Sequence, residues 1–493
     1  MIPQKTFLEK KINKGIELLK KKDFSGSIKI FEYLKKNNST KIIGLFFLGI
    51  IKIQQNDNNL AKKYFFQLLE LNPNHEGANL NLALVYFKEQ KYDESKIYLN
   101  KVIEINETNL NAFYHKGLIY FHLKDFNKAI NYFEICTNLQ NNHIYSYLNL
   151  GHCFLRIKKF DKAIKNYSKV LALDTNNNTS KFNLSWCYFA NLNFKNAFKF
   201  YEYRKEKTLP GEKLKEVNAK IKSNEWEGEN LDNKTILILS EQGIGDNIQF
   251  FRYLYWINEK YNVDILFYTD EKISHLFNNS PFKIITTLDN LDHVDFHKLL
   301  LSLPGIYYKE KNTFYKKIDY IKPNNDLIIK WESKLKNYKK PIVALNWQGD
   351  QNFAFDSTRS IPLSFFKKIL EIDKFSFISL QKGFGAEQIK INNLEQKLTD
   401  LSNEIDNNNA FEDSMSILMN VDFFITSDTA LCHLACTLGV KTYLLLENNP
   451  DWRWYIEKKF KCFYPDIKII QQKEPGNWDG VFRELKENLN KDY

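Results

Sequence analysis

The stretch Thr235–Tyr253, TILILSEQGIGDNIQFFRY, decides the fold of the C-terminal half. Its apolar run, Thr235–Leu239, breaks at a turn that carries Gly243 and Gly245, and a helical pattern follows. A strand, a glycine turn and a helix in this order predict the opening unit of a doubly wound α/β domain. Ligands of such sheets bind outside the carboxyl ends of the strands, which is where Asp246 stands.

The glycines and the acid of this turn have two interpretations. A dinucleotide fingerprint would have a third glycine where this chain has Ile248, so a nicotinamide cofactor is not favoured. The simpler interpretation is a tight strand-to-helix turn in which Asp246 caps a helix that begins at Asn247. Capping explains the acid but not the paired glycines, which indicate that the backbone closely approaches another group.

Length and composition limit the classes of protein. A chain of 493 residues is expected to hold two to four domains, and 43% hydrophobic with 26% charged residues is ordinary for a globular protein. The longest apolar runs, such as Ile42–Ile51, are shorter than the ~18 residues of a membrane span. No secretory signal is visible, and six scattered cysteines without CxxC spacing indicate neither a zinc site nor disulfides. We therefore expect a reduced, cytoplasmic chain.

Charge is divided unevenly along the chain. Residues Met1–Leu209 carry a formal net charge of +15, whereas the remainder carries −4. A basic half can attract nucleic acid or anionic lipid. No compact stripe of arginine and aromatic residues is present, however, so a solvated outer helix face is favoured and no nucleic-acid partner is expected.

The N-terminal half is an array of repeats. Small residues recur with a spacing of 34 residues, a second small residue follows each after twelve residues, and a large apolar residue stands four further on. This spacing predicts six pairs of helices over 1–209, the tetratricopeptide pattern, stacked into a superhelix. The small residues let paired helices approach, and each large residue fills the groove that the next unit leaves. The three sets are Gly15, Gly49, Ala83, Gly117, Gly151 and Ser185; Ser27, Ala61, Ser95, Ala129, Ala163 and Ala197; and Phe31, Phe65, Leu99, Phe133, Tyr167 and Tyr201.

The remaining chain reads as a connection followed by two α/β halves. Residues 210–233 are expected to hold a charged helix and a linker, with Trp226 as a plug between domains. The halves are 234–340, on the acceptor side, and 341–493, on the nucleotide side, and a ligand is expected in the cleft between them. Seven mostly β-branched or aromatic runs predict buried parallel strands: Thr235–Leu239, Val263–Tyr268, Lys283–Thr287, Ile342–Asn346, Ser376–Leu380, Val421–Thr426 and Thr442–Leu446.

Two strand ends in the second half carry polar residues that suit a phosphate. The loop after Asn346 leads to Arg359, whose guanidinium can hold phosphate oxygens at two points; a plain surface arginine is equally compatible with the sequence. The strand ending at Leu380 continues into Gln381 and Lys382, of which the lysine faces either a phosphate or water.

A third strand end, within Val421–Ala435, gives the strongest signal. Its strand runs into Ser427, Asp428 and Thr429, and a helix starts near Ala430. Free backbone N–H groups at a helix start form an anion site, and an ordinary N-cap is compatible with the same residues. His433, about one turn into this helix, is more often structural than catalytic.

Four motifs together resemble a known family. They are Glu241–Tyr253 (EQGIGDNIQFFRY), Ser427–Ala435 (SDTALCHLA), Pro450–Trp454 (PDWRW) and Trp478-Asp479-Gly480. The region from Trp226 to Leu489 is similar to tetratricopeptide-containing glycosyltransferases, which are related to the bacterial heptosyltransferases of glycosyltransferase family 9. The resemblance implies the GT-B architecture of two Rossmann-like domains. The repeat array upstream of Trp226 also fits this family.

The resemblance also implies roles for individual residues. Asp246 corresponds to the catalytic base, Arg359 to the basic residue that holds the leaving phosphate, and Ser427–Thr429 to the turn that contacts the diphosphate. Ala430 stands where heptosyltransferases usually have glycine, and a histidine and a proline after the first motif are missing, which leaves the donor sugar open. The residues assigned to the nucleotide sugar are Gly243, Gly245, Gln249, Arg359, Gln381, Ser427, Asp428, Thr429 and His433.

The expected activity is therefore inverting glycosyl transfer from a nucleotide-diphosphate donor to a protein or glycan. Asp-x-Asp is absent from the sequence, so neither a metal nor another cofactor is expected, and cationic and dipolar groups replace it. The repeats would present the acceptor, or bind a protein or peptide on their concave face. The alternative is a non-catalytic tetratricopeptide scaffold with a degenerate transferase module.

Overall fold

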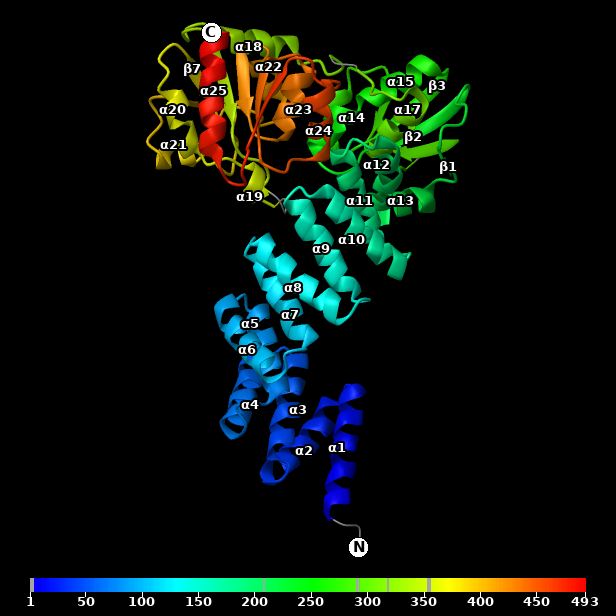
Figure 1. Cartoon of the computed structure of the whole chain (residues 1–493). Coiled ribbons are helices and arrows are strands. Elements are labelled where there is room, and N and C mark those ends of the chain that lie inside the picture. Colours follow the sequence, from blue (N-terminus) through cyan, green and yellow to red (C-terminus); the bar gives the residue numbers. More distant parts are fainter. Residues whose placement is uncertain (1–3, 207–208, 290, 292, 317–318, 353–355) are drawn as a thin grey trace. The chain divides into compact units, whose positions relative to one another are not determined.

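The computed structural model of the protein describes residues 4–206, 209–289, 291, 293–316, 319–352 and 356–493. The chain divides into two compact units, Met1–Ser180 and Lys181–Tyr493 (Figure 1). Each unit has its own architecture: helices alone in the first, and helices with two parallel sheets in the second.

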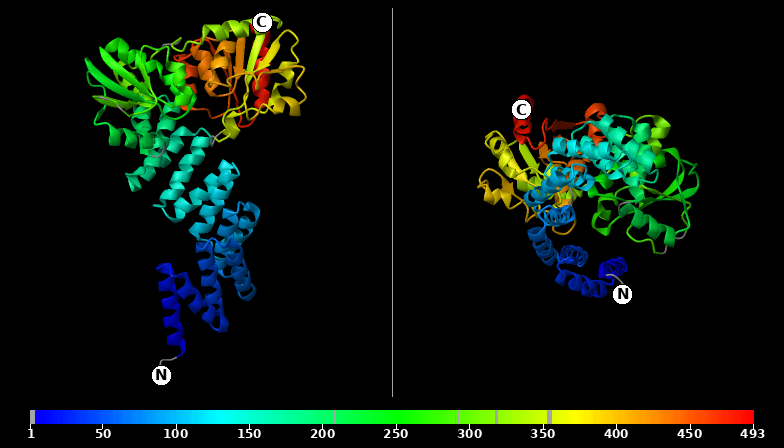
Figure 2. Two further views of the ribbon diagram at one scale, coloured as in Figure 1. Left: turned by 180° about the vertical axis from the view of Figure 1, so that it is seen from behind. Right: turned by 60° about the horizontal axis from the view of Figure 1, so that its bottom comes forward.

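The first unit is a stack of helix pairs. Short turns join the two helices of each pair, and successive pairs follow one another along the unit in Figure 1 and in the left view of Figure 2. The pairs are α1 (Gln4–Lys20) with α2 (Phe24–Lys36), α3 (Lys41–Gln54) with α4 (Asn58–Leu71), α5 (Glu76–Lys88) with α6 (Tyr92–Ile105), α7 (Leu110–His122) with α8 (Phe126–Leu139), and α9 (Ile144–Arg156) with α10 (Phe160–Leu173).

The turn inside each pair contains one residue in the left-handed backbone conformation. One non-glycine residue in every turn has φ between 58° and 60°, and these residues recur with the repeat: Lys22, Asn56, Gln90, Lys124, Lys158 and Leu192. In four of the six pairs the next residue caps the second helix through its side chain, namely Asp23, Asp57, Asp125 and Asn193. The same backbone geometry therefore closes every helix pair, including the sixth.

Small and large residues of the repeat meet inside each pair. A Cβ at Gly117 would lie 2.6 Å from the ring of Phe133, so only glycine lets these helices pack at this distance. Hydroxyls reinforce the contact, since Ser95 Oγ donates to the carbonyl of Ala83 at 2.8 Å. The expected contact with the following unit is present at Phe31, whose ring stacks on Phe47 with centroids 4.7 Å apart. The large residue of each repeat thus packs mainly against the small residue of its own helix pair.

The sixth helix pair lies in the second unit. It comprises α11 (Asn178–Ala190), most of which follows the boundary at Ser180, and α12 (Phe194–Tyr201). After it come η1 (Glu202–Glu206) and α13 (Leu209–Lys220). The sequence grouped all six repeats as 1–209, whereas by packing the sixth pair belongs with the α/β region.

The second unit contains two separate parallel sheets. The five-stranded sheet has the order β1-β5-β2-β3-β4, and the six-stranded sheet has the order β11-β10-β9-β6-β7-β8. The first is built from β1 (Asn224–Glu225), β2 (Lys234–Leu239), β3 (Val263–Tyr268), β4 (Lys283–Ile285) and β5 (Phe296–Leu299). The second is built from β6 (Ile342–Asn346), β7 (Ser376–Ser379), β8 (Thr399–Asp400), β9 (Phe423–Thr426), β10 (Thr442–Leu446) and β11 (Ile467–Gln471).

Helices cover both sheets (Figure 1). In each sheet the first long strand is central, and the chain adds strands first to one side and then to the other. This order is doubly wound, with switch points between β2 and β5 and between β6 and β9. The helices are α14 (Ile244–Phe250), α15 (Arg252–Lys260), α16 (Glu271–Ser274), η2 (His275–Phe277), η3 (Leu300–Ser302), α17 (Leu303–Lys311), α18 (Asn325–Leu335), α19 (Asp356–Arg359), η4 (Leu363–Phe366), α20 (Lys367–Leu370), α21 (Gln388–Ile391), α22 (Glu412–Leu418), α23 (Ala430–Thr437), α24 (Trp452–Phe460) and α25 (Trp478–Asp492).

All seven predicted strands are present within two residues of their expected ends. Four further strands, β1, β5, β8 and β11, were not predicted. β5 shows no apolar run in the sequence, because its centre holds two buried polar residues, His297 and Lys298. Each is satisfied by a neighbour: His297 Nδ1 lies 2.8 Å from Ser223 Oγ, and Lys298 Nζ donates to the carboxylate of Glu225 at 2.9 Å.

The role of Trp226 as a plug between domains stays a prediction. Trp226 is fully buried in the core of the second unit, where its ring lies 6.0 Å from that of Trp256. Its indole N–H donates to the carbonyl of Glu229 at 2.9 Å. Trp226 therefore anchors the start of the five-stranded sheet. Of the described helices, none is long and apolar enough to cross a membrane.

The packing of the repeats gives a first prediction. A Cβ at Gly151 would lie 2.5 Å from the ring of Tyr167, so Gly151→Leu should lower the free energy of unfolding by about 1–3 kcal/mol. Gly480→Leu is the control, because a Cβ there meets nothing closer than Asn477 Oδ1 at 3.8 Å. Denaturant unfolding measures both. Equal losses for the two variants would contradict the proposed helix packing.

Candidate functional site

The glycine turn after β2 is organised by the side chains that follow it. Gly243 is the N-cap of α14, and its backbone N–H donates to Asp246 Oδ2 at 2.9 Å. Asn247 Nδ2 donates to the carbonyl of Gly243 at 2.9 Å. Asp246 therefore does cap a helix, as the simpler interpretation held, but from the third position of a helix that begins at Ile244.

The second carboxylate oxygen of Asp246 meets a cation from α24. Oδ1 lies 2.5 Å from Arg453 Nη2, although the angles do not make a directed hydrogen bond. The same guanidinium donates through Nε to Asp451 Oδ1 at 2.7 Å and through Nη1 to Gln249 Oε1 at 3.3 Å. All of these side chains except Asp451 are buried. Asp246 and Arg453 thus form a buried ion pair between the two α/β halves.

Burial dominates the electrostatics of this cluster. It raises the pKa of Asp246, and the nearby Arg453 only partly offsets the effect. It also raises the pKa of Asp428 to about 6, against the attraction of Arg453 and Arg359. Burial by itself lowers the pKa of Arg453, but the charges of Asp246 and Asp451 raise it well above its ordinary value. The cation is therefore fixed, whereas both acids hold a proton more readily than an ordinary carboxylate.

Gly245 explains why the turn needs a second glycine. A Cβ at this position would lie 2.6 Å from His433 Cδ2, so α14 and α23 can pack this closely only with glycine here. The group that the backbone approaches is therefore His433, within the protein. The ring of His433 stacks on Trp454 with centroids 5.1 Å apart, and its Nδ1 lies 2.9 Å from Tyr464 Oη. Burial and nearby arginines hold its pKa well below the ordinary value, so the imidazole is neutral.

A second group of polar residues stands at the switch point of the six-stranded sheet. Asn346, at the end of β6, accepts from Thr429 Oγ1 at 2.9 Å and donates to Gln381 Oε1 at 2.8 Å. Gln381 also accepts the backbone N–H of Gln348 at 3.0 Å, so it fixes the loop after β6. Ser427 is fully buried, and its hydroxyl has no hydrogen-bond partner among the described residues.

The two predicted basic residues have different environments. Arg359 lies beside Gly349, and its Nε is 3.3 Å from Asp356 Oδ1, with 21% of the side chain exposed. Part of the loop before it, 353–355, lies outside the described residues. Lys382 donates to the carbonyl of Ile405 and, at 2.7 Å, to Asn407 Oδ1. Lys382 therefore holds the loop that contains Ile405 and Asn407, and its amino group does not face Arg453.

The structure brings most of the predicted site residues together. Asp246, Gln249 and Asp428 gather around Arg453, while Gln381 and Thr429 meet at Asn346. Sequence reasoning missed Arg453 as a site residue, although it lies in the quoted motif PDWRW. The available signal was an arginine between two tryptophans, Trp452 and Trp454. Among the described residues, no three His, Cys, Asp or Glu side chains are arranged to hold a metal ion. Metal independence stays a prediction.

A second ion pair supports the glycine turn from the sixth repeat. Arg204 of η1 donates to both oxygens of Glu241, at 2.6 and 2.9 Å, and to Ser302 Oγ at 2.9 Å. Glu241 also accepts the backbone N–H of Leu301 at 2.8 Å. Arg204 and Glu241 are both fully buried. Since Glu241 follows β2 and Leu301 follows β5, this network holds the first switch point together.

Aromatic packing supports the other side of the cluster. Trp452, the neighbour of Arg453, stacks on Phe189 of α11 with centroids 4.2 Å apart and on Phe250 of α14 at 5.8 Å. Tyr201 of α12 adds an edge contact at 5.6 Å. The sixth helix pair is thus packed directly behind the residue that pairs with Asp246.

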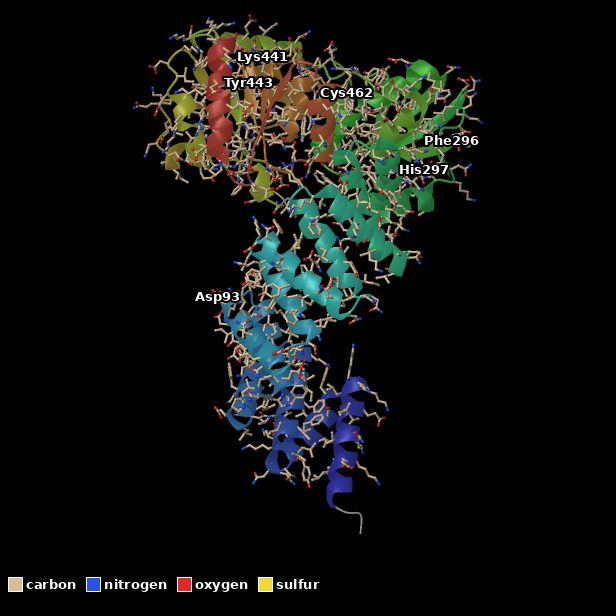
Figure 3. The ribbon with its side chains drawn as sticks, viewed as in Figure 1. Asp93, Phe296, His297, Lys441, Tyr443 and Cys462 are labelled. Carbon is tan, nitrogen blue, oxygen red and sulfur yellow. The ribbon has the colours of Figure 1, made fainter. Side chains whose placement is uncertain are left out.

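Lysines line a hollow elsewhere, at the amino ends of β10 and β11. Lys441, Lys461 and Lys468 contribute to it together with Gly439 and Pro465. Asp492 of α25 neutralises two of these lysines, with Oδ2 at 2.5 Å from Lys468 Nζ and 3.5 Å from Lys441 Nζ. Tyr443 also donates to Asp492, and Figure 3 shows Tyr443 and Lys441 beside α25. These contacts hold α25 against the six-stranded sheet.

Comparison with known proteins identifies the first unit. Residues 144–177 match the tetratricopeptide repeat family, and residues 54–136 match the family described as anaphase-promoting complex, cyclosome, subunit 3. The N-terminal helices are tetratricopeptide repeats. These matches do not extend to the α/β region.

Among curated proteins, this repeat-containing chain is similar to Protein FlbA of Caulobacter vibrioides. The two are 20% identical over 281 residues, which cover 52% of this chain and 46% of FlbA. The match thus spans about half the length of that relative.

Three solved structures are each similar to about a third of the chain. MamA 41-end from Desulfovibrio magneticus RS-1 is 20% identical, with a TM-score of 0.32 and coverage of 34% of this chain and 96% of MamA. YrrB, described as a TPR protein with an unusual peptide-binding site, has 20% identity, a TM-score of 0.32 and coverage of 35% and 89%. PilF of Pseudomonas aeruginosa has 20% identity, a TM-score of 0.31, and coverage of 33% and 74%.

The Arg204–Glu241 pair gives a stability prediction. Glu241→Gln removes the carboxylate that accepts two hydrogen bonds from the buried Arg204 guanidinium, while Glu202 remains 3.1 Å from its Nη1, and should lower the free energy of unfolding by about 1.5–3 kcal/mol. Glu404→Gln is the matched control, because Glu404 and its partner Lys334 are about half exposed and such pairs contribute at most about 1 kcal/mol. Thermal or denaturant unfolding of the whole chain tests this. A loss for Glu241→Gln no larger than the control's would refute the structural role.

Asp428 predicts a pH dependence of stability. Its pKa is raised in the folded protein to about 6, so the folded state binds its proton more tightly than the unfolded state. The free energy of unfolding therefore falls as pH rises from about 4 to 6, by about 2–3 kcal/mol for this group. Asp428→Asn should remove that fall, so the variant gains stability over the parent across this range. Asp466→Asn, at an exposed site, is the control and should show no such trend.

Proposed function

We propose that the α/β region is an inverting glycosyltransferase that moves a sugar from a nucleotide-diphosphate donor to an acceptor hydroxyl. One observation carries this proposal: a buried carboxylate, Asp246, lies at the carboxyl edge of one parallel sheet and beside a cation, Arg453, from the half that holds the other sheet. Two doubly wound sheets, each with its own switch point, favour the GT-B architecture as the finer description of the fold.

The proposed reaction uses Asp246 as general base. Asp246 takes the proton of the acceptor hydroxyl while that oxygen attacks the anomeric carbon. The new carbon–oxygen bond forms as the bond between the anomeric carbon and the diphosphate breaks, and the departing diphosphate carries away the electron pair. The raised pKa of Asp246 suits this task, because a carboxylate with a higher pKa is a stronger base.

Fixed groups stabilise the negative charge that develops on the leaving diphosphate. Arg359, the hydroxyl of Ser427 and the first backbone N–H groups of α23 supply a cation and donors near one strand end. Asn346 holds Thr429, the N-cap of α23, and so orients that helix start. His433 packs against aromatic rings and serves as structural support. In this proposal the cationic and dipolar groups take the place of a metal ion.

The repeats are proposed to bind the acceptor or a partner protein. Stacked repeats of this kind form an extended concave surface, which is a common place for peptides and proteins to bind. The repeat pattern of the first unit supports the same role here. An acceptor that is a protein or a glycan, held on the repeats, is therefore the partner we propose.

A specific observation favours the second candidate, a scaffold without catalysis. Asp246 is already paired with Arg453, and an acid whose charge is neutralised by an arginine is a poor base. In that case the acid and the arginine would only hold the two halves together.

Replacing the acid by its amide separates the two candidates. Asp246→Asn can still accept the backbone N–H of Gly243 through its amide oxygen, but it cannot accept a proton at neutral pH. Release of nucleoside diphosphate from a panel of nucleotide sugars, with protein and glycan acceptors, should fall by ~100- to 10,000-fold.

Asp270→Asn is the matched control for this experiment. Asp270 also follows a strand and caps a helix, accepting the backbone N–H of Lys272 at 2.9 Å. The control should transfer sugar at the parent's rate. Transfer that survives in Asp246→Asn would reduce the acid to a cap. A parent protein inactive with every donor and acceptor would favour the scaffold.

A further inference from the structure

The surroundings of Arg453 contain buried donors without acceptors. Its guanidinium has five N–H groups, of which two donate to Asp451 and Gln249, while Nη2 lies beside Asp246 without a directed hydrogen bond. Among the described residues, Gln249 Nε2 has no hydrogen-bond partner although its side chain is fully buried, and the same is true of Ser427 Oγ, next to Asp428, whose charge interacts with that of Arg453. Buried donors are costly when they are left unpaired. An acceptor-rich ligand at this place would satisfy them.

The two carboxylates on Arg453 hold it in different ways. Asp451 lies two residues away on the same turn, and one of its oxygens accepts both the backbone N–H of Arg453 at 3.1 Å and Nε at 2.7 Å. Asp246 comes from α14, on the other α/β half, and meets only the tip of the side chain without a directed hydrogen bond. The contact with Asp246 is therefore the one that a ligand between the halves can replace.

We propose that Arg453 binds the diphosphate of the donor and that, in the absence of donor, it holds Asp246 in an ion pair. This inference rests on the proposed function and assigns a residue that the sequence analysis left without a role. On donor binding, phosphoryl oxygens take Nη2 from Asp246, while Asp451 keeps Nε in place. Guanidinium suits this exchange, because it binds carboxylate and phosphate with the same planar donor geometry.

The exchange makes Asp246 a stronger base when donor is present. Without its cation, a buried carboxylate binds a proton more tightly, so Asp246 then accepts the proton of the acceptor hydroxyl more readily. The electron pair of the broken bond passes to the diphosphate, whose charge Arg453 already neutralises. Donor therefore binds before catalysis can begin, and the paired state protects the acid from acting on other hydroxyls.

Binding of nucleoside diphosphates to four variants of the full chain tests the exchange. Calorimetry with ADP, GDP, UDP, CDP and TDP first finds the nucleotide that the parent binds. Arg453→Met should weaken that binding by about ten- to a hundredfold, the range for a lost charged hydrogen bond. Arg453→Lys keeps a cation, and serves if the methionine variant does not fold; it should weaken binding less.

Asp246→Asn should have the opposite effect and tighten binding by about tenfold, because the nucleotide no longer competes with a carboxylate for Arg453. A structural defect does not tighten binding. Asp451→Asn is the matched control: it removes the same charge from the same guanidinium but not the contact that is exchanged. It should therefore give no such gain.

The outcomes separate this inference from the proposed function. If the parent binds a nucleoside diphosphate but Asp246→Asn binds it no more tightly, the exchange is refuted while the proposed function stands. Equal tightening by Asp451→Asn would also refute it, since general repulsion between charges would then explain both. If neither the parent nor Asp246→Asn binds any of the five nucleotides, the proposed function falls and the inference with it.

Discussion

The buried ion pair between Asp246 and Arg453 is the interaction on which the rest of the second unit depends. It joins α14 to α24 and lies next to the contact of Gly245 with His433, so the two α/β halves meet through charge and close packing at once. Two buried charges stabilise each other only while they stay together. Any movement that parts the halves must therefore give each charge a new partner, which restricts the movements available to those that a ligand accompanies.

The surrounding structure keeps this pair in position. The Arg204–Glu241 pair fixes the start of the glycine turn, and Trp452 fixes the helix that carries Arg453. Both supports come from the sixth helix pair and η1, although these elements continue the pattern of the repeats. Groups placed on loops keep a precise geometry only when rigid neighbours hold them. The final repeat therefore serves the α/β unit as part of its framework.

Much of this arrangement could be predicted from sequence, and the failures have physical causes. A fixed spacing of small and large residues predicted the helix pairs, and apolar runs predicted seven strands. β5 was missed because buried His297 and Lys298 interrupt its pattern. The glycine turn and the polar strand ends were located, but the partner of Asp246 was not. Arg453 is 207 residues further along the chain, and a contact over that distance leaves no periodic signal. The environment of Lys382 was left open for the same reason, since its partners follow it by more than twenty residues.

The place of the sixth helix pair bears on how such a chain can change in evolution. Repeats that contact only their neighbours can be duplicated or lost one at a time, because each new junction resembles the old one. That freedom holds for the helix pairs of the first unit. It ends at α11, where Phe189 and Tyr201 have partners outside the repeat pattern. Relatives of this protein should therefore differ in the number of repeats near the N-terminus, whereas the last pair should be inherited together with the sheets.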